Sequence, residues 1–261
     1  MRAVAVHADV VVVVSAVWQT TCTAVRSGDE GFVIDSPVLP DELDALPALL
    51  EQAGFPLSGL LATHGDWDHL LGRLAFPDAS LGVGEATARR LSAELGAPQR
   101  ALRAFDEEHY IARGRPLALA GVQELPVPGK LALGARELEL HPADGHTADG
   151  TAFWIPWAQT VVCGDYLSPV EIPMISEGGS AGAYAATLAR LRPLVSQAET
   201  VVPGHGGPVP GRRALELLDE DTAYLAALTG DPTTATPPES RRAKAQQRIH
   251  ADNLARVAGA D

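Results

Sequence analysis

The chain has 261 residues, of which 46% are hydrophobic, so it can bury a sizeable core and is not expected to be disordered throughout. The formal net charge is −13, and Lys130 and Lys244 are the only lysines. Because affinity for nucleic acid depends on neutralising phosphates, this balance disfavours DNA or RNA as the main partner. The sequence has no apolar run of about 18 residues, so we expect no membrane span and a cytoplasmic protein.

The first half of the chain alternates short strands with two helices. The valine-rich run, and the two segments that flank the turn Ser27-Gly28-Asp29-Glu30, are typical of strands. Residues 40–53 have helical periodicity, with acidic residues in the first turn and Gly54 beyond the last. In chain order we expect strands over 10–17, 22–26 and 31–35, a helix over 40–53, a strand over 57–63, a helix over 85–95 and strands within 117–140.

The second half continues this alternation and ends in helices. In chain order we expect strands over 151–156 and 160–163, a helix over 182–194, a strand over 200–203, and helices over 212–228 and 241–258. Residues 231–240 are rich in proline and threonine, which is typical of a linker. We therefore expect one catalytic domain over 1–230, with the linker and C-terminal helix of 231–261 packed on it. Strands and helices in this order favour a sandwich of sheets with helices outside.

Four of the eight histidines, His64, His69, His146 and His205, each follow a predicted strand, where a rigid scaffold presents functional groups. The first two belong to the segment Thr63-His64-Gly65-Asp66-Trp67-Asp68-His69, which gathers imidazoles and carboxylates within one turn. This set of donors suits zinc, manganese or iron better than calcium or magnesium. The alternative is a solvated acidic turn with two incidental histidines.

Four ordered motifs of this chain resemble those of the metallo-β-lactamase superfamily. That pattern is His-x-His-x-Asp-His after a strand, followed by Gly-His-Thr, Gly-Asp and Gly-His-Gly. The corresponding segments here are Thr63–His69, Gly145-His146-Thr147, Gly164-Asp165 and Pro203-Gly204-His205-Gly206. The resemblance spans about residues 10–209, and it implies an α/β (α+β) fold, a four-layer αββα sandwich with a metal site at one edge of its sheets.

The resemblance also implies how the site works. One ion would take His64 and His146, and a second would take Asp68, His69 and His205, with Asp165 bridging the two. Two zinc ions are expected, although one would suffice, and iron or manganese are the alternatives. A metal-bound hydroxide would attack an ester, lactone or thioester carbonyl, because bound cations lower the pKa of water. Asp68 would be the catalytic carboxylate that orients this hydroxide.

Asp66 stands where the family pattern has its second histidine. Its carboxylate reaches less far than an imidazole, so it would fall short of the first metal, contact it through water or require a shift of the loop. With Asp68 and Asp165 it also brings three carboxylates to the site, which balance two divalent ions and a hydroxide. We therefore hypothesise a less electrophilic site that accepts manganese or iron more readily.

Asp165 is typical of thioesterases of the glyoxalase II type, lactonases and phosphodiesterases, whereas zinc β-lactamases commonly have Cys or Ser at that place. The acidic chain disfavours polyanions, so we expect a neutral or weakly charged small-molecule substrate. Two alternatives stay open: a di-iron redox protein related to flavodiiron reductases, and a degenerate metal-binding scaffold without activity. Those reductases carry a flavodoxin domain, for which the segment after Val209 is too short. A homodimer also stays open.

Several other residues near the motifs have a structural interpretation that we prefer. We expect Trp67 and Tyr166 to pack, rather than to hold a substrate or an oxyanion. Ser180 is expected to cap the helix that follows it. His250 and Asn253 are expected on an amphipathic helix, rather than over the mouth of a pocket.

Overall fold

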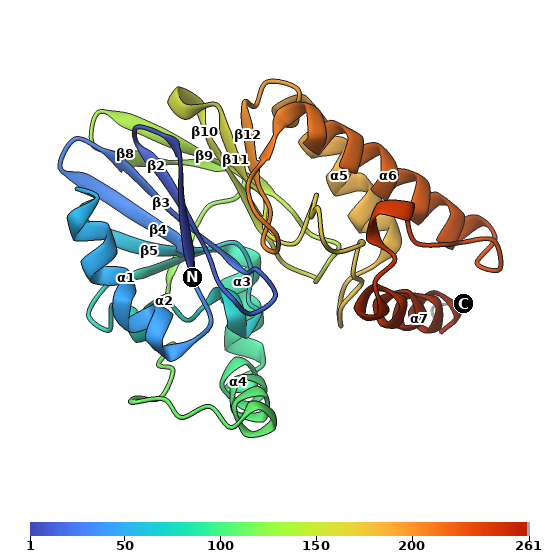
Figure 1. Ribbon diagram of the computed structural model, residues 1–261, viewed down its shortest axis with the longest axis horizontal. Helices are drawn as coiled ribbons and strands as arrows, with labels where there is room; N and C mark the ends of the chain where they lie inside the picture. Colours follow the sequence, from blue (N-terminus) through green and yellow to red (C-terminus); the bar gives the residue numbers. More distant parts are fainter. Residues whose placement is uncertain (260–261) are drawn as a thin grey trace.

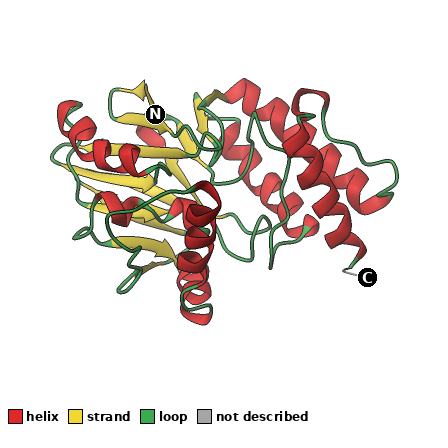
Figure 2. Cartoon of the chain, turned by 60° about the horizontal axis from the view of Figure 1, so that its bottom comes forward, coloured by secondary structure: helices red, strands yellow, loops and turns green. Residues whose placement is uncertain are grey.

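Two β-sheets pack face to face, and helices cover the outer face of each, as Figure 1 shows for this computed structural model. The structure describes residues 1–259. The four layers are therefore helices, sheet, sheet and helices, the αββα sandwich expected from the sequence motifs. In the turned view of Figure 2 the strands likewise lie between groups of helices.

The first sheet contains seven strands in sequence order. Its first four strands pair antiparallel, and the last four pair parallel with helical crossovers between them. The strands are β1 (Arg2–His7), β2 (Val10–Val14), β3 (Thr21–Ser27), β4 (Glu30–Asp35), β5 (Gly59–Ala62), β6 (Leu81–Gly84) and β7 (Gln123–Leu125).

The second sheet contains six strands in the order β13-β12-β11-β10-β9-β8. All of its neighbours are antiparallel except β11 and β12, which a helix connects. The strands are β8 (Gly129–Leu133), β9 (Arg136–Pro142), β10 (Thr151–Ile155), β11 (Thr160–Val162), β12 (Thr200–Val202) and β13 (Val209–Pro210).

The helices divide between the two outer layers. Four follow the strands of the first sheet: α1 (Pro40–Gln52), α2 (Gly72–Ala75), α3 (Glu85–Ala93) and α4 (Ala97–His109). Three belong with the second sheet: α5 (Ala181–Val195), α6 (Gly211–Gly230) and α7 (Lys244–Ala258). Short 3-10 turns occur at η1 (Trp67–His69), η2 (Pro156–Ala158) and η3 (Glu239–Arg241). Within residues 1–259, no helix has both the length and the apolar character needed to cross a bilayer.

The unbroken valine run of the sequence is explained by β2, whose five residues are all buried. Val10 and Val12 face the second sheet, where they pack in one cluster with Phe153, whereas Val11 and Val13 belong to the cluster beneath α1 and α2. A strand covered on both faces needs apolar side chains at every position, so no alternation appears.

The observed elements differ from the expected ones at a few places. The strand expected over 10–17 ends at Val14, because the chain then forms a loop in which Trp18 and Gln19 have positive φ. The terminal helix begins at Lys244 rather than at residue 241, because a 3-10 turn precedes it. Neither β1 nor α4 is among the elements expected from the sequence.

Candidate metal centre

The adjacent parallel strands β4 and β5 end side by side and bring Asp35 next to Thr63. Asp35 accepts hydrogen bonds from the amide of Thr63 at 2.8 Å and from its hydroxyl at 2.9 Å. The same carboxylate lies 3.1 Å from Nδ1 of His69. Asp35 is buried and has a φ of 60°, which is uncommon outside glycine. It therefore fixes both the loop after β5 and the ring of His69.

The loop after β5 continues into η1, which carries two of the expected ligands. The amide of His69 donates to the carbonyl of Asp66 at 3.1 Å and closes this turn. Asp68 and His69 are consequently presented on consecutive positions, and both are buried. Trp67, which precedes them, packs on Phe105 with ring centroids 4.8 Å apart, as expected from the sequence.

His146 lies on the loop between β9 and β10, where the backbone passes very close to α5. Gly145 has a φ of 127°, and a Cβ there would lie 2.2 Å from the amide nitrogen of Tyr184, so only glycine fits. The amide of His146 donates to the hydroxyl of Tyr166 at 3.0 Å, and that hydroxyl donates to the carbonyl of Ala143 at 3.1 Å. Tyr166 thus has the structural role expected of it.

Asp165 and His205 follow the neighbouring strands β11 and β12, whose ends meet at the same edge of the second sheet. The amide of Gly204 donates to the carbonyl of Gly164 at 2.6 Å. A Cβ on Gly204 would lie 2.0 Å from Oδ1 of Asp165, so the backbone itself forms a wall of the site. The first sheet also holds this loop in place, because the amide of Thr21 on β3 donates to the carbonyl of Gly204 at 2.8 Å.

The Nδ1 atom of each site histidine faces a partner that fixes the ring. His146 Nδ1 donates to the carbonyl of Met174 at 2.8 Å. Nδ1 of His64 lies 3.0 Å from the hydroxyl of Thr63, whose proton goes to Asp35, so the imidazole donates there. By the same reasoning, Nδ1 of His205 donates at 3.3 Å to the hydroxyl of Thr20, whose own proton goes to the carbonyl of Val17.

Nδ1 of His69 makes no hydrogen bond within the described residues, but the carboxylate of Asp35 at 3.1 Å favours a proton on that nitrogen, so each of the four imidazoles, when neutral, carries its proton on Nδ1. Nε2 of each ring is left as an unprotonated donor atom that faces the site. Imidazoles that bind metals are held in this manner by their second nitrogen.

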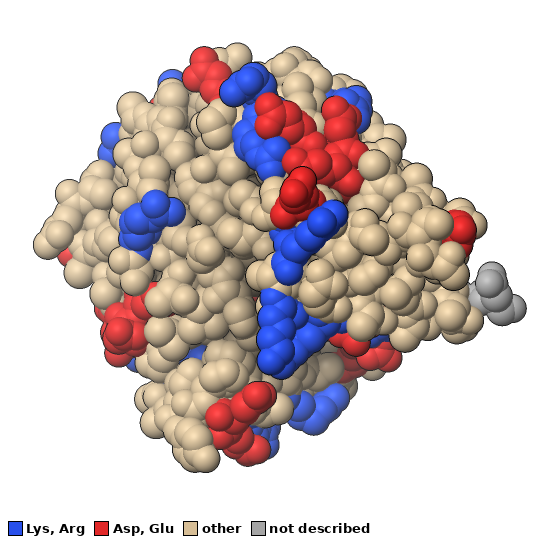
Figure 3. Space-filling view, turned by 45° about the vertical axis from the view of Figure 1, so that its right-hand side comes forward, with Lys and Arg blue, Asp and Glu red and all other residues tan. Residues whose placement is uncertain are grey.

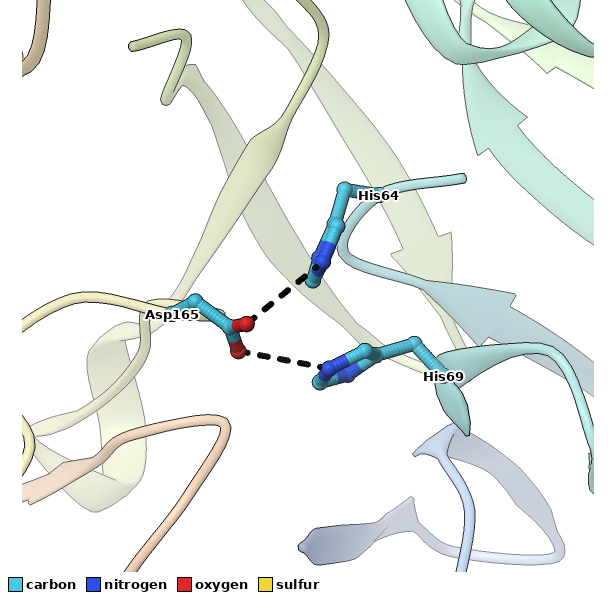
Figure 4. Close-up of side chains that lie close together, drawn as sticks. All are labelled: His64, His69 and Asp165. Atoms are coloured by element: carbon cyan, nitrogen blue, oxygen red, sulfur yellow. Dashed lines mark ion pairs between the residues drawn. The ribbon is translucent and has the colours of Figure 1, made fainter. Parts of the chain in front are cut away.

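The four Nε2 atoms converge on the carboxylate of Asp165. The separations are 3.8 Å for His64, 3.2 Å for His69, 3.2 Å for His146 and 3.4 Å for His205. Figure 4 shows Asp165 facing His64 and His69 from the opposite side of the site.

All seven residues expected from the sequence come together in this region. In three overlapping sets, one potential ligand atom per residue lies within 4.8 Å of the others. The sets are His64, Asp66 and His146; Asp68, His69 and His205; and His64, His69 and Asp165.

The chemistry of these donors fits divalent cations. Among the residues that the structure describes, no hydrogen-bond partner exists for three buried atoms that face the site, Nε2 of His64, Nε2 of His69 and Oδ1 of Asp165. Buried polar atoms are rarely left unpaired, because each costs free energy comparable to a lost hydrogen bond. A set of imidazole nitrogens and carboxylate oxygens with unpaired lone pairs is what zinc, iron or manganese binds.

Without metal, the carboxylates bias the site strongly towards protonated histidines. Burial alone would lower the pKa of His205, but Asp165 and Glu171 raise it to about 10. Burial is likewise outweighed at His146, where Asp165 and Asp66 raise the pKa to about 9. A metal must displace these protons when it binds.

Asp66 occupies the place between His64 and His146, opposite Asp165. Its Oδ2 lies 3.7 Å from Nε2 of His64 and 3.5 Å from Nε2 of His146. Its Oδ1 faces away from the histidines and accepts a hydrogen bond from Nη2 of Arg90 at 2.8 Å. Burial would raise the pKa of Asp66, but His146, His64 and Arg90 hold it far below its usual range. The carboxylate is therefore ionised, with one oxygen directed at the site.

Three charged residues beside the site are absent from the sequence-based candidates. Arg90 and Asp149 form an ion pair at 2.8 Å next to Asp66. Asp149 follows His146 by three positions, which could have marked it, whereas nothing in the sequence of α3 distinguishes Arg90. Burial raises the pKa of the Glu171 carboxyl, although the positive charge of His205 acts to lower it.

A groove of about 210 Å³ opens directly beside Asp66. Arg90 and Glu94 line it with charged side chains, and the rest of its wall is apolar side chains or backbone. These other lining residues are Gly65, Trp67, Leu91, Ala97, Pro98 and Ala101.

Near the other side of the site, Trp18 is 47% exposed and packs edge-on against Trp67, with ring centroids 5.7 Å apart. The centroid of its ring lies 6.4 Å from that of His205. On the face in Figure 3, acidic and basic side chains share one band and the rest is largely uncharged.

The C-terminal segment holds the loop that orients His146. Asn253 is fully buried, accepts from the amide of Ile175 at 2.9 Å and donates to the carbonyl of Pro173 at 2.7 Å. The intervening residue is Met174, the partner of the His146 ring. The expectation of a plain amphipathic helix was therefore incomplete, because the buried Asn253 side chain holds the backbone on both sides of Met174.

Ser180 caps α5 as expected, since its side chain accepts a hydrogen bond from the amide of Ala183.

Comparison with known proteins agrees with this architecture. The family model described as the metallo-β-lactamase superfamily matches residues 16–205. The chain therefore belongs to the metallo-β-lactamase superfamily. No curated protein matches it.

Several solved structures share the fold at low sequence identity. A metallo-β-lactamase family protein from Thermus thermophilus is 20% identical, with a TM-score of 0.68, and the alignment covers 98% of this chain and 96% of that one. The inverting sec-alkylsulfatase Pisa1 from Pseudomonas sp. is 15% identical with a TM-score of 0.73, over 98% of this chain and 50% of the sulfatase. The protein TTHA1623, solved in a di-iron-bound form, is 23% identical with a TM-score of 0.61, over 79% and 97%.

Proposed function

We propose that the protein is a metal-dependent hydrolase of uncharged or weakly charged small-molecule esters, lactones or thioesters. The observation that carries this proposal is the orientation of four histidines, each with Nδ1 beside a polar group of the protein and Nε2 within 3.8 Å of Asp165.

His64, Asp66 and His146 would hold one ion and Asp68, His69 and His205 a second, with Asp165 between them. Divalent ions in such a site supply a Lewis acid and lower the pKa of a water molecule. We propose zinc as the resident metal, with iron and manganese as the alternatives. The di-iron form of TTHA1623 gives a reason to include iron in every metal analysis.

The chain's own carboxylates would then handle the proton. Asp68 is buried, with Oδ2 3.6 Å from Nε2 of His69 and 3.5 Å from Nε2 of His205. It is the residue that we assign to orienting and deprotonating the attacking water.

The surroundings of the site favour a substrate without strong charge. The groove beside Asp66 is mostly apolar, and the cation that lines it, Arg90, already pairs with three carboxylates, those of Asp66, Asp149 and Glu94. An anionic group would find no free partner there and would also face the acidic site. An exposed indole at Trp18 suits an apolar substituent.

The test is turnover of a panel of substrates by protein loaded with zinc, manganese or iron. The panel contains aryl esters, lactones, thioesters, a phosphodiester and a secondary alkyl sulfate. We expect hydrolysis of a carbonyl substrate by wild-type protein and its loss in Asp68→Asn, with Asp78→Asn, an exposed carboxylate, as the matched control. Metal-loaded protein that hydrolyses only the sulfate or the phosphodiester would contradict the assigned reaction, and inactivity on the whole panel would contradict hydrolysis.

A further inference from the structure

One arginine, Arg90, connects the loop of Asp66, which stands where the family pattern has its second histidine, to the loop that carries His146. Nη2 of Arg90 donates to Oδ1 of Asp66 at 2.8 Å, and Nη1 donates to Oδ1 of Asp149 at 2.8 Å. The guanidinium is therefore hydrogen-bonded to two carboxylates, one from each half of the chain, and its Nε also lies 3.8 Å from a carboxylate oxygen of Glu94. A planar group with two parallel sets of donors is suited to this, and a lysine is not.

Asp149 makes this contact rigid. Its side chain is almost completely buried, and its Oδ2 accepts a hydrogen bond from the amide of Gly65 at 2.9 Å. Asp149 thus holds the backbone between His64 and Asp66 with one oxygen and the guanidinium of Arg90 with the other. The packing is close, since a Cβ on Gly65 would lie 3.3 Å from Asp149 Oδ2 and 3.5 Å from Arg90 Nη1.

The consequence for Asp66 is that its carboxylate has one orientation. With Oδ1 bound to Arg90, Oδ2 is directed between the rings of His64 and His146, at 3.7 and 3.5 Å from their Nε2 atoms. Zinc–ligand bonds of about 2.1 Å in a tetrahedral site require ligand atoms separated by about 3.4 Å. Both separations from Oδ2 of Asp66 are close to that value, and the three atoms lie within 4.8 Å of one another, so the shorter side chain does reach the first metal position.

We propose that Arg90 is a positioning residue that makes Asp66 a monodentate ligand of the first metal, in place of the histidine of the family pattern. This inference rests on the proposed function only in requiring that the site binds metal. Arg90 touches neither metal nor substrate in this role, and acts through Asp66. Losing the partner that orients a ligand typically lowers metal affinity about 10–100-fold.

The experiment is a zinc titration of chelator-treated protein against a chromophoric competitor, which gives stoichiometry and affinity without any assay of activity. We expect two tight sites in the wild type. The Arg90→Met variant should retain one tight zinc site and bind the other zinc ion about 10–100-fold more weakly. The affinity of Arg90→Lys for that second ion should lie between those of Arg90→Met and the wild type. Arg89→Met is the matched control, because Arg89 lies on the same helix, is 69% exposed and pairs with Glu85 at 3.6 Å.

A second variant separates positioning from a general structural effect. Histidine reaches the metal without help from a guanidinium, so Asp66→His combined with Arg90→Met should restore two tight sites. If the double variant stays deficient, or if Arg90→Met alone binds two ions as tightly as wild type, the inference is wrong. Wild-type protein with one tight ion overturns the role of Arg90 and leaves hydrolysis standing, whereas wild-type protein without metal overturns both.

Discussion

Replacing Asp35 by asparagine removes one charge and almost no volume, which makes it a sharp test of how the second metal position is built. The two oxygens of this buried carboxylate accept the amide and the hydroxyl of Thr63, at 2.8 and 2.9 Å, and one of them lies 3.1 Å from Nδ1 of His69. An asparagine side chain offers one acceptor oxygen and one NH₂ group.

Both orientations of the new amide are unfavourable. If its NH₂ faces the amide of Thr63, two donors meet and a buried hydrogen bond is lost. If it faces His69, the imidazole must move its proton to Nε2, which then cannot bind a metal. We expect Asp35→Asn to lower the free energy of unfolding of the metal-free protein by about 1–3 kcal/mol, the cost of one buried unsatisfied donor. Metal affinity should fall about 10–100-fold at the position that His69 serves.

Urea unfolding of the metal-free protein measures the first effect, and zinc titration with a competing chelator measures the second. Asp78→Asn removes the same charge from an exposed position and should change the free energy of unfolding by less than about 0.5 kcal/mol. If Asp35→Asn matches this control in both measurements, Asp35 does not fix the tautomer of His69, and the argument for the histidine orientations is wrong.

Trp18→Ala should raise KM for substrates with an apolar substituent about tenfold and leave kcat within about twofold, because the indole adds binding without touching the reacting atoms; an unchanged KM would remove Trp18 from the substrate site. Asn253→Ala should lower the free energy of unfolding by about 1–3 kcal/mol, since it leaves two backbone groups unpaired, whereas the exposed neighbour Asp252→Ala should have little effect in the same urea experiment. In the metal-free protein the raised pKa values of His146 and His205 stabilise the fold fully below their unfolded value of about 6.5, and this stabilisation is lost as pH rises through about 9 to about 10. Unfolding curves should therefore show falling stability over that range for metal-free protein and a smaller change for zinc-loaded protein, and equal slopes would contradict these pKa shifts.

The histidines were predictable because each follows an apolar strand, and strand ends at one edge of a sandwich lie together. His64 after β5 and His205 after β12 illustrate this, since their rings both reach Asp165 from different sheets. Asp165 likewise follows an apolar strand, β11, and the motif order then distinguished it from a helix cap. The sandwich followed from the same motifs and from the alternation of strands and helices.

The setting of Asp66 could not be predicted from its own segment. Its partner Arg90 lies 24 positions further along the chain, and Asp149 lies 59 positions beyond Arg90, so the three meet only in the folded protein.

The helix α4 was not predicted from the sequence, for a different reason. Most of its residues are exposed, and it buries few side chains, such as Leu102 and Phe105, so its apolar stripe was too thin to stand out.

The first metal position draws on both halves of the molecule, since His64 and Asp66 follow a strand of the first sheet and His146 follows a strand of the second. An ion bound there is therefore a cross-link between the two sheets as well as a reagent. Ligands that bind only the folded state add stability in proportion to the logarithm of their concentration, about 2.7 kcal/mol at a hundredfold excess over Kd. With such an ion bound, the stability of the fold would depend on the metal concentration, and chelation would remove this link between the sheets.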